Sequence, residues 1–154
     1  MAVTFSVDKT ATGPVLRIEG DLDETTDFGR VAHPGGGTLT IDLGGVRRIN
    51  SCGVREWVNF IRGITAQGPV RLTRCSIAIV EQLNMVFNFR GGAQVDSFCA
   101  PYCCSQCEAS SVVLLTPAEV GGGAVPARRC EACGGNTTLD DLPERYLAFL
   151  EGGS

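Results

Sequence analysis

The chain has 154 residues, of which 44% are hydrophobic, and its formal net charge is −4 at pH 7. That length suits one ordinary domain, or one domain with a small module attached. No apolar run approaches the roughly 20 residues of a membrane-spanning helix, and the N-terminus lacks the charged start and apolar block of a secretory signal, so we expect a cytoplasmic protein without membrane insertion.

Short strands and helices alternate through the first two thirds of the chain. Alternating apolar residues and β-branched runs predict strands at residues 3–7, 15–20, 38–43, 70–73 and 94–98. After the second strand we expect a short helix, capped by Asp23 or Thr25 and ended by the Gly/Pro-rich residues 33–37. Strands that alternate with helices predict an α/β layer with a mixed sheet.

Two amphipathic helices follow the third and fourth predicted strands. The first has one apolar stripe, formed by Val54, Trp57, Val58, Ile61 and Ile64. Asn50 or Ser51 is its predicted cap, and Gly68-Pro69 ends it. Ser76 is the predicted cap of the second helix, whose inward residues should be Ile79, Val80, Leu83, Val86 and Phe87. We expect Phe87 and the nearby Phe89 to belong to the core.

Two Cys-x-x-Cys pairs near the end of the chain are separated by 22 residues. This spacing is typical of a four-thiolate zinc site, because a two-residue gap lets both sulfurs of a pair face one ion. Disulfides are the alternative, but a chain without a secretory signal is expected in a reducing compartment. The predicted ligands of a structural zinc ion are Cys104, Cys107, Cys130 and Cys133. Cys103 is their rival with a poorer spacing, whereas Cys52 and Cys75 are interpreted as small buried residues.

The segment around these cysteines is predicted to be a zinc ribbon. Residues 112–115 and 124–129 are expected to be its two arms, with Gly121-Gly122-Gly123 as a flexible tip. A short helix over residues 142–150, capped by Asp140 or Asp141, should close the chain. Residues 99–154 carry three Arg against seven acidic residues, so they lack the positive charge that phosphate binding requires. Nucleic acid is therefore disfavoured as a partner.

Three segments of the N-terminal part together resemble the STAS domain (sulfate transporter and anti-sigma-factor antagonist). They are Gly20-Asp-Leu-Asp23, Ile41-Asp-Leu-Gly-Gly-Val46 and Ile49-Asn-Ser-Cys-Gly-Val54. The resemblance covers residues 1–98 and leaves residues 99–154 as a zinc-ribbon module with a short C-terminal helix. It implies a sheet of four to five strands with helices on one side. It also implies a non-enzymatic role, because such domains bind partner proteins and many are switched by a kinase.

In that family a hydroxyl group at the start of a helix is the phosphorylation site. The matching residues here are Asn50-Ser51-Cys52-Gly53, in which only Ser51 keeps a hydroxyl. Ser51 is either a surviving phospho-acceptor at a helix N-terminus or a helix cap. Our hypothesis is a degenerate member of the family that binds its partner without the usual phospho-switch.

The partner-binding surface implied by this resemblance comprises the loop after the second strand and the start and outer face of the first helix. Its predicted residues are Asp23, Asn50, Ser51, Cys52, Arg55, Asn59 and Arg62. A solvated surface without a partner is the alternative interpretation of these residues. Catalysis by Cys52 is disfavoured, because nothing ties the only histidine, His33, to it as a base.

Two functions remain from this sequence. The first is a signalling adaptor that docks on a protein such as an anti-sigma factor with a kinase fold. The second is a STAS-like accessory subunit of a bacterial ABC-type transport system. Both are protein-binding roles, and neither makes the chain an enzyme.

Overall fold

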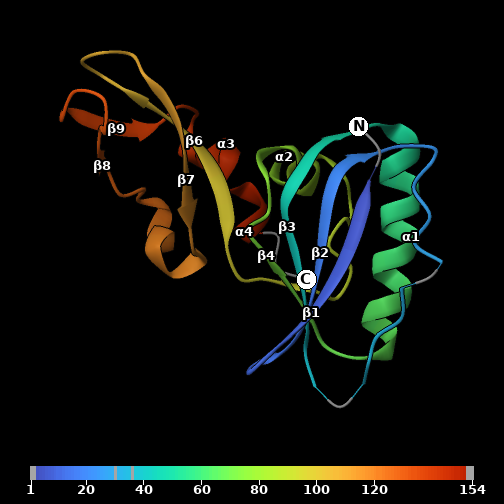
Figure 1. Ribbon diagram of the computed structural model, residues 1–154. Helices are drawn as coiled ribbons and strands as arrows, with labels where there is room; N and C mark the ends of the chain where they lie inside the picture. The colour runs from blue at the N-terminus through green and yellow to red at the C-terminus, as the bar shows by residue number, and fades with distance from the viewer. Residues whose placement is uncertain (1–2, 30, 36, 152–154) are drawn as a thin grey trace.

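The computed structural model describes residues 3–29, 31–35 and 37–151, and these form two sheets with helices against them (Figure 1). The five strands of the first sheet lie in chain order: β1 (Thr4–Thr10), β2 (Gly13–Leu22), β3 (Leu39–Ile49), β4 (Val70–Thr73) and β5 (Gln94–Val95). The second sheet contains β6 (Phe98–Cys104), β7 (Ser110–Leu115), β8 (Arg128–Arg129) and β9 (Asn136–Leu139) in the order β7-β6-β9-β8. The helices are α1 (Ser51–Gln67), α2 (Ile77–Met85), the 3₁₀ helix η1 (Pro117–Gly123), α3 (Pro143–Tyr146) and α4 (Ala148–Glu151).

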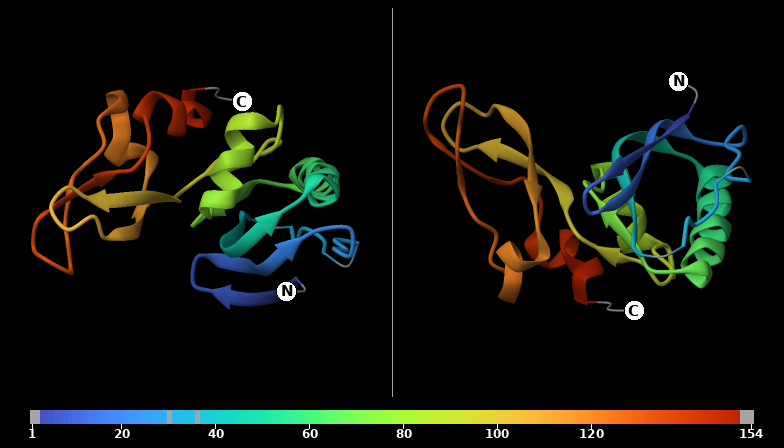
Figure 2. Two further views of the ribbon diagram at one scale, coloured as in Figure 1. Left: turned by 90° about the horizontal axis from the view of Figure 1, so that it is seen from above. Right: turned by 60° about the horizontal axis from the view of Figure 1, so that its bottom comes forward.

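The first sheet is mixed, as the sequence predicted. Strand β1 pairs antiparallel with β2, whereas β2, β3, β4 and β5 pair in parallel. Helices α1 and α2 lie on the same side of the strands (Figure 2, left). Trp57 of α1 is fully buried and donates from its indole N–H to the carbonyl of Phe89, 2.7 Å away, which ties α1 to the segment after α2.

Helix α1 begins and ends where local chemistry requires it. Asn50, one of the two predicted caps, accepts a hydrogen bond from the backbone N–H of Gly53 at 2.9 Å, whereas Ser51 is the first helical residue. At the other end the His33 ring packs against Gly68, where an added Cβ would lie 2.6 Å from the ring. The predicted cap of α2 is also confirmed, because Ser76 accepts from the N–H of Ile79 at 3.4 Å.

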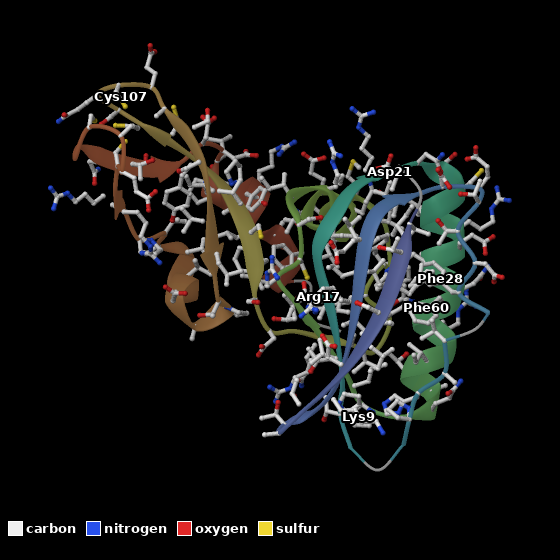
Figure 3. All side chains as sticks on the ribbon, viewed as in Figure 1. Lys9, Arg17, Asp21, Phe28, Phe60 and Cys107 are labelled. Carbon is white, nitrogen blue, oxygen red and sulfur yellow. The ribbon has the colours of Figure 1, made fainter. Side chains whose placement is uncertain are left out.

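The short helix expected after β2 does not form within the described residues 23–29 and 31–35. The Asp23 carboxylate accepts from both the N–H and the hydroxyl of Thr25, and such local bonds compete with a helical backbone. Phe28 then fixes the path of the segment. Its ring is buried and stacks on Phe60 of α1 with a centroid distance of 4.4 Å (both residues are labelled in Figure 3).

The expected inward position of Phe87 is wrong, because its side chain is 91% exposed. Helix α2 ends at Met85, so the helical spacing that would have turned Phe87 inward stops two residues earlier. The neighbouring prediction is confirmed, since Phe89 is 1% exposed and packs on Trp57.

The two sheets are joined by backbone bonds and by a shared core. The N–H of Cys99 donates to the carbonyl of Cys75 at 2.8 Å, so β6 leaves the first sheet beside the residues that follow β4. From the C-terminal helices, Tyr146 donates to the carbonyl of Cys99 at 2.6 Å, and Phe149 packs edge-on against Phe98. Asn84 of α2 fixes this arrangement, because its side chain bonds to both C-terminal helices.

The pairing inside the second sheet differs from the expected hairpin. Residues 112–115 lie in β7, but their partner is β6, while only Arg128 and Arg129 of the other expected arm form a strand, which pairs with β9. The expected glycine tip is the end of η1, and the expected final helix is split into α3 and α4 around Leu147. Helix α3 has no side-chain cap, because neither Asp140 nor Asp141 precedes its first turn directly.

Candidate metal centre

The sulfur atoms of Cys104, Cys107, Cys130 and Cys133 converge at the end of the second sheet that lies away from the first. All four atoms lie within 4.8 Å of one another, and the group could hold a metal ion. Two of the separations are 3.5 Å, between Cys104 and Cys133, and 3.6 Å, between Cys107 and Cys130. Figure 3 marks this end of the molecule with the label of Cys107.

These distances fit a tetrahedral thiolate site and exclude disulfides. With metal–sulfur bonds of about 2.3 Å, a regular tetrahedron places its sulfurs about 3.8 Å apart. A disulfide would require about 2.0 Å, and all eight cysteines are free. The four sulfurs therefore need little movement to surround one ion.

Two turns of similar build carry the four sulfurs. In the first, the N–H of Glu108 donates to the carbonyl of Cys104 and the N–H of Cys104 to that of Ala109. The second repeats both bonds, from Gly134 to Cys130 and from Cys130 to Gly135. The residue after each second cysteine has a positive φ, 61° at Glu108 and 77° at Gly134. Both pairs of cysteines are thus held by the same backbone geometry.

Backbone N–H groups in these turns point at the sulfurs. Those of Gln106 and Cys107 donate to Cys104 Sγ at 3.4 and 3.5 Å, and that of Gly135 donates to Cys133 Sγ at 3.4 Å. The bonds from Cys107 and Gln106 lower the pKa of the Cys104 thiol to about 6. Backbone N–H bonds lower the pKa of Cys107 and Cys133, but bonds to neighbouring sulfurs raise it overall. Of these three residues, Cys104 therefore most readily takes the thiolate form that binds a metal.

The remaining cysteines do not join the cluster. Cys103 bonds through its sulfur to the backbone carbonyl of Cys104, so this rival ligand lies outside the group of four. Cys75 is fully buried, and burial raises the pKa of its thiol, which fits the interpretation as a small apolar residue. Burial likewise raises the pKa of the half-buried Cys99. Cys52 is half-buried in the first turn of α1.

His33, the only histidine, holds two backbone segments together and lies far from the cluster cysteines in the sequence. Its Nδ1 accepts from the N–H of Gly35 at 2.9 Å, so the proton is on Nε2, which donates to the carbonyl of Pro69 at 2.9 Å. Both ring nitrogens are therefore engaged in holding the loop before β3 against the end of α1.

Four of the predicted partner-binding residues, Asp23, Asn50, Ser51 and Cys52, gather where β2, β3 and α1 meet. The N–H of Asn50 donates to the carbonyl of Leu22 at 3.1 Å, and its side-chain amide donates to Glu24 at 3.0 Å. Hydrogen bonds from Thr25 lower the pKa of Asp23. The other three residues continue along the exposed face of α1, and they are Arg55, Asn59 and Arg62.

The glycine of the Asn-Ser-Cys-Gly segment permits this arrangement. A Cβ at Gly53 would lie 2.1 Å from the carbonyl oxygen of Leu22, so only glycine allows α1 to start so close to the end of β2. The close approach holds Asn50 and Ser51 beside the loop that carries Asp23. These residues thus form one surface, although 27 positions separate Asp23 from Asn50 in the chain.

Sequence reasoning missed one buried charge in the first sheet. The Asp42 side chain is 6% exposed and receives Arg74 at 3.1 Å, Arg17 at 3.5 Å and the N–H of Gly44 at 2.9 Å. Asp42 lies at an outward position of an alternating strand, where an exposed carboxylate is the ordinary expectation. No local pattern indicates that two arginines from neighbouring segments cover it.

Comparison with known proteins offers no relative from which to carry over a function. No protein-family model matches the chain, and no curated protein matches its sequence. Among the described residues, no helix has the length and apolar character needed to cross a bilayer. The cysteine cluster and the surface at the start of α1 are the features of the molecule that bear on its function.

Proposed function

We propose that the chain is a non-enzymatic, protein-binding adaptor of the anti-sigma-factor-antagonist type, in which a structural zinc ion maintains the C-terminal sheet. The observation that carries the adaptor role is the joint surface of Asp23, Asn50 and Ser51 at the start of α1. It combines segments from two strand ends with a helix start on a rigid support. A partner that bound there would contact groups held in place before it arrived.

The chemistry of this surface favours recognition over catalysis. The side chains of Asn50 and Asp23 accept hydrogen bonds from the backbone N–H groups of Gly53 and Thr25. The exposed residues along α1 are Arg55, Asn59 and Arg62. The one histidine is engaged elsewhere, so no imidazole base serves Cys52 or Ser51. Exposed polar and positively charged groups on a helix face suit the rim of a protein interface.

Ser51 is part of the proposed binding surface and does not act as a phospho-switch. The capping role belongs to Asn50, so the Ser51 hydroxyl stands on the first exposed turn of α1. In the proposed function, partner binding by the wild-type protein is the same in cells with and without active kinases. Phosphate on Ser51 in native protein, with loss of a partner as the result, would replace this part of the proposal by the switched form.

Zinc is the proposed metal because four thiolates are its preferred structural ligand set. The cluster contains four protein sulfurs, which fill a tetrahedral shell and leave no open position for a substrate. Elemental analysis of protein purified without added metal should give about one zinc per chain. Another metal in that proportion would correct the identity of the ion and leave its structural role in place.

The adaptor role is tested by quantitative affinity capture from the native host. Wild-type protein is compared with R55E/R62E, which reverses two charges on the proposed surface, and with R129E as a matched control on the ribbon. We expect one signalling protein of the anti-sigma-factor kinase class to be retained by wild type and R129E and lost by R55E/R62E. Retention of that protein by all three variants, or capture of a transporter ATPase in its place, would contradict the proposal.

A further inference from the structure

The hydroxyl of Thr137 on β9 is a buried polar group without a hydrogen-bond partner among the described residues. The residue is 3% exposed, and its hydroxyl oxygen is sealed from solvent. It is the one buried side-chain nitrogen or oxygen in the described part of the chain that lacks a partner. A buried hydroxyl without a partner costs about 1–3 kcal/mol of stability. We therefore expect an acceptor that forms when a ligand or metal ion binds nearby.

The register of the sheet places Thr137 directly opposite Cys104, a residue of the sulfur cluster. Two ladder bonds fix which kind of pair this is. Ser105 donates to the carbonyl of Asn136 at 3.1 Å, and Asp140 donates to that of Pro101 at 2.8 Å. Bonded and non-bonded pairs alternate in an antiparallel ladder, so Cys104 and Thr137 form a non-hydrogen-bonded pair.

Non-hydrogen-bonded pairs are the close ones. Their Cα atoms lie about 4.5 Å apart, and directly opposite side chains project from the same face of the sheet. Both Cys104 and Thr137 are buried, so no solvent layer separates them. The threonine hydroxyl and the cysteine sulfur therefore lie on the same side of the sheet, on directly opposite residues.

The sulfur of Cys104 is a strong acceptor as a thiolate, and a bound metal ion holds it in that form. Four thiolates around one divalent ion carry a net charge of −2, and such sites are stabilised by donors in the surrounding shell. Cys104 already receives N–H bonds from Gln106 and Cys107. A neutral thiol is a weak acceptor, so the hydroxyl has a strong partner wherever the ion holds this sulfur as a thiolate.

We propose that Thr137 donates a hydrogen bond from its hydroxyl to the Cys104 thiolate in the metal-loaded protein, and so positions this ligand and strengthens its bond to the ion. The inference rests on the proposed metal site. It makes Thr137 a positioning residue of that site, contributed by the strand next to the ligand and not by either Cys-x-x-Cys turn.

The test is the zinc affinity of the full chain, measured by competition with a chelator, in wild type and in T137V, T137S and T138V. Valine keeps the shape and strand preference of threonine but removes the donor, so T137V should bind zinc about tenfold more weakly. T137S keeps the hydroxyl and should remain within about threefold of wild type. T138V is the control, because Thr138 is exposed and lies opposite Cys103.

The sign of the T137V effect decides the proposal. If the hydroxyl stayed unpaired in the metal-loaded protein, its removal would relieve a buried polar group, and zinc would bind equally well or more tightly. Either result would overturn the inference, as would T137S weakening zinc as much as T137V. With Co²⁺ as the probe, the sulfur-to-metal charge-transfer band should move to lower energy in T137V and not in T138V.

Failure of the metal site itself has a different signature. A wild-type chain that binds neither Zn²⁺ nor Co²⁺ would remove both the proposed site and the role of Thr137. A wild-type chain that binds both ions, with T137V unchanged in affinity and spectrum, would remove only the role of Thr137.

Discussion

The two sheets of this protein are stabilised by different kinds of buried residue. The first is covered by α1 and α2, and its core contains large apolar side chains such as Trp57, Ile41 and Leu72, all fully buried. The second has an apolar core that starts where Phe98 and Phe149 pack together beside α2 and reaches as far as Tyr102 of β6. At its far end the buried residues are Cys104, Cys130 and Thr137.

The difference shows where hydrophobic burial stops being sufficient in a chain of this size. Strands β8 and β9 have two and four residues, too few to bury a core of their own. A bound ion can supply the missing stabilisation, because a preformed site does not exist in the unfolded chain and binding energy becomes folding energy. The two sheets should therefore respond differently to loss of metal and to loss of packing.

Removal of the metal should have the largest effect and should be confined to one sheet. Structural zinc contributes about 10–16 kcal/mol of apparent binding free energy in small modules, so a strong chelator should unfold the part of the second sheet around the cluster. Amide hydrogen exchange should show protection lost in β7, β8 and β9 and retained in β2, β3 and β4. Equal loss in both sheets would mean that they unfold as one unit, and no loss in either would mean that the cluster needs no ion.

Single cysteine substitutions should separate the cluster from its neighbours. C107S removes one of four ligands from an exposed position and should abolish stoichiometric zinc binding. C103S is the matched control, because Cys103 precedes the first ligand directly but its sulfur lies outside the cluster. Zinc content measured after dialysis should fall in C107S alone, and a fall in C103S as well would place Cys103 among the ligands.

Spacing alone predicted the cluster because the chemistry is local to each Cys-x-x-Cys turn. The pairing of the strands around it was not predictable in the same way. Strand β6 pairs with β7 on one side and with β9 on the other, and the second contact joins residues more than 30 positions apart. Thr137 left no signal at all, because a threonine in a short strand is an ordinary residue until the ladder sets it opposite Cys104.

Glycine substitutions in α1 should test the packing of the first sheet. An added Cβ at Gly53 meets the backbone of Leu22, so G53A should destabilise the protein by about 3 kcal/mol, near the upper end of overpacking effects. Gly63, on the same helix, has open space around it, and G63A should stabilise by about 1 kcal/mol through helix propensity. Chemical denaturation followed by Trp57 fluorescence measures both, and a G53A protein as stable as wild type would show that the start of α1 is free to move away from β2.

The first sheet was predictable where its residues repeat and unpredictable where one side chain decides. The periodic stripe and the Asn50 cap predicted α1 to within a residue at both ends. The segment after Asp23 contains good helix caps but is held in an irregular path by Phe28, whose partner Phe60 is 32 residues away. Phe87 shows the same limit, since the end of α2 two residues earlier determines where it points.

The smallest effect should come from the residue that follows each pair of cysteines. Glu108 has a left-handed backbone with φ of 61°, a conformation that suits glycine, so E108G should stabilise the metal-loaded protein by about 1 kcal/mol.

Gly134 is the equivalent residue of the second turn, with φ of 77°. An added Cβ there would only touch Arg129, at an ordinary contact distance of 3.5 Å, so G134A should destabilise by about 1 kcal/mol through backbone strain alone. Thermal unfolding in the presence of zinc measures both shifts. Opposite signs at the two positions follow from one backbone geometry that holds glutamate in one turn and glycine in the other, whereas shifts of the same sign would mean that the two turns are not equivalent in solution.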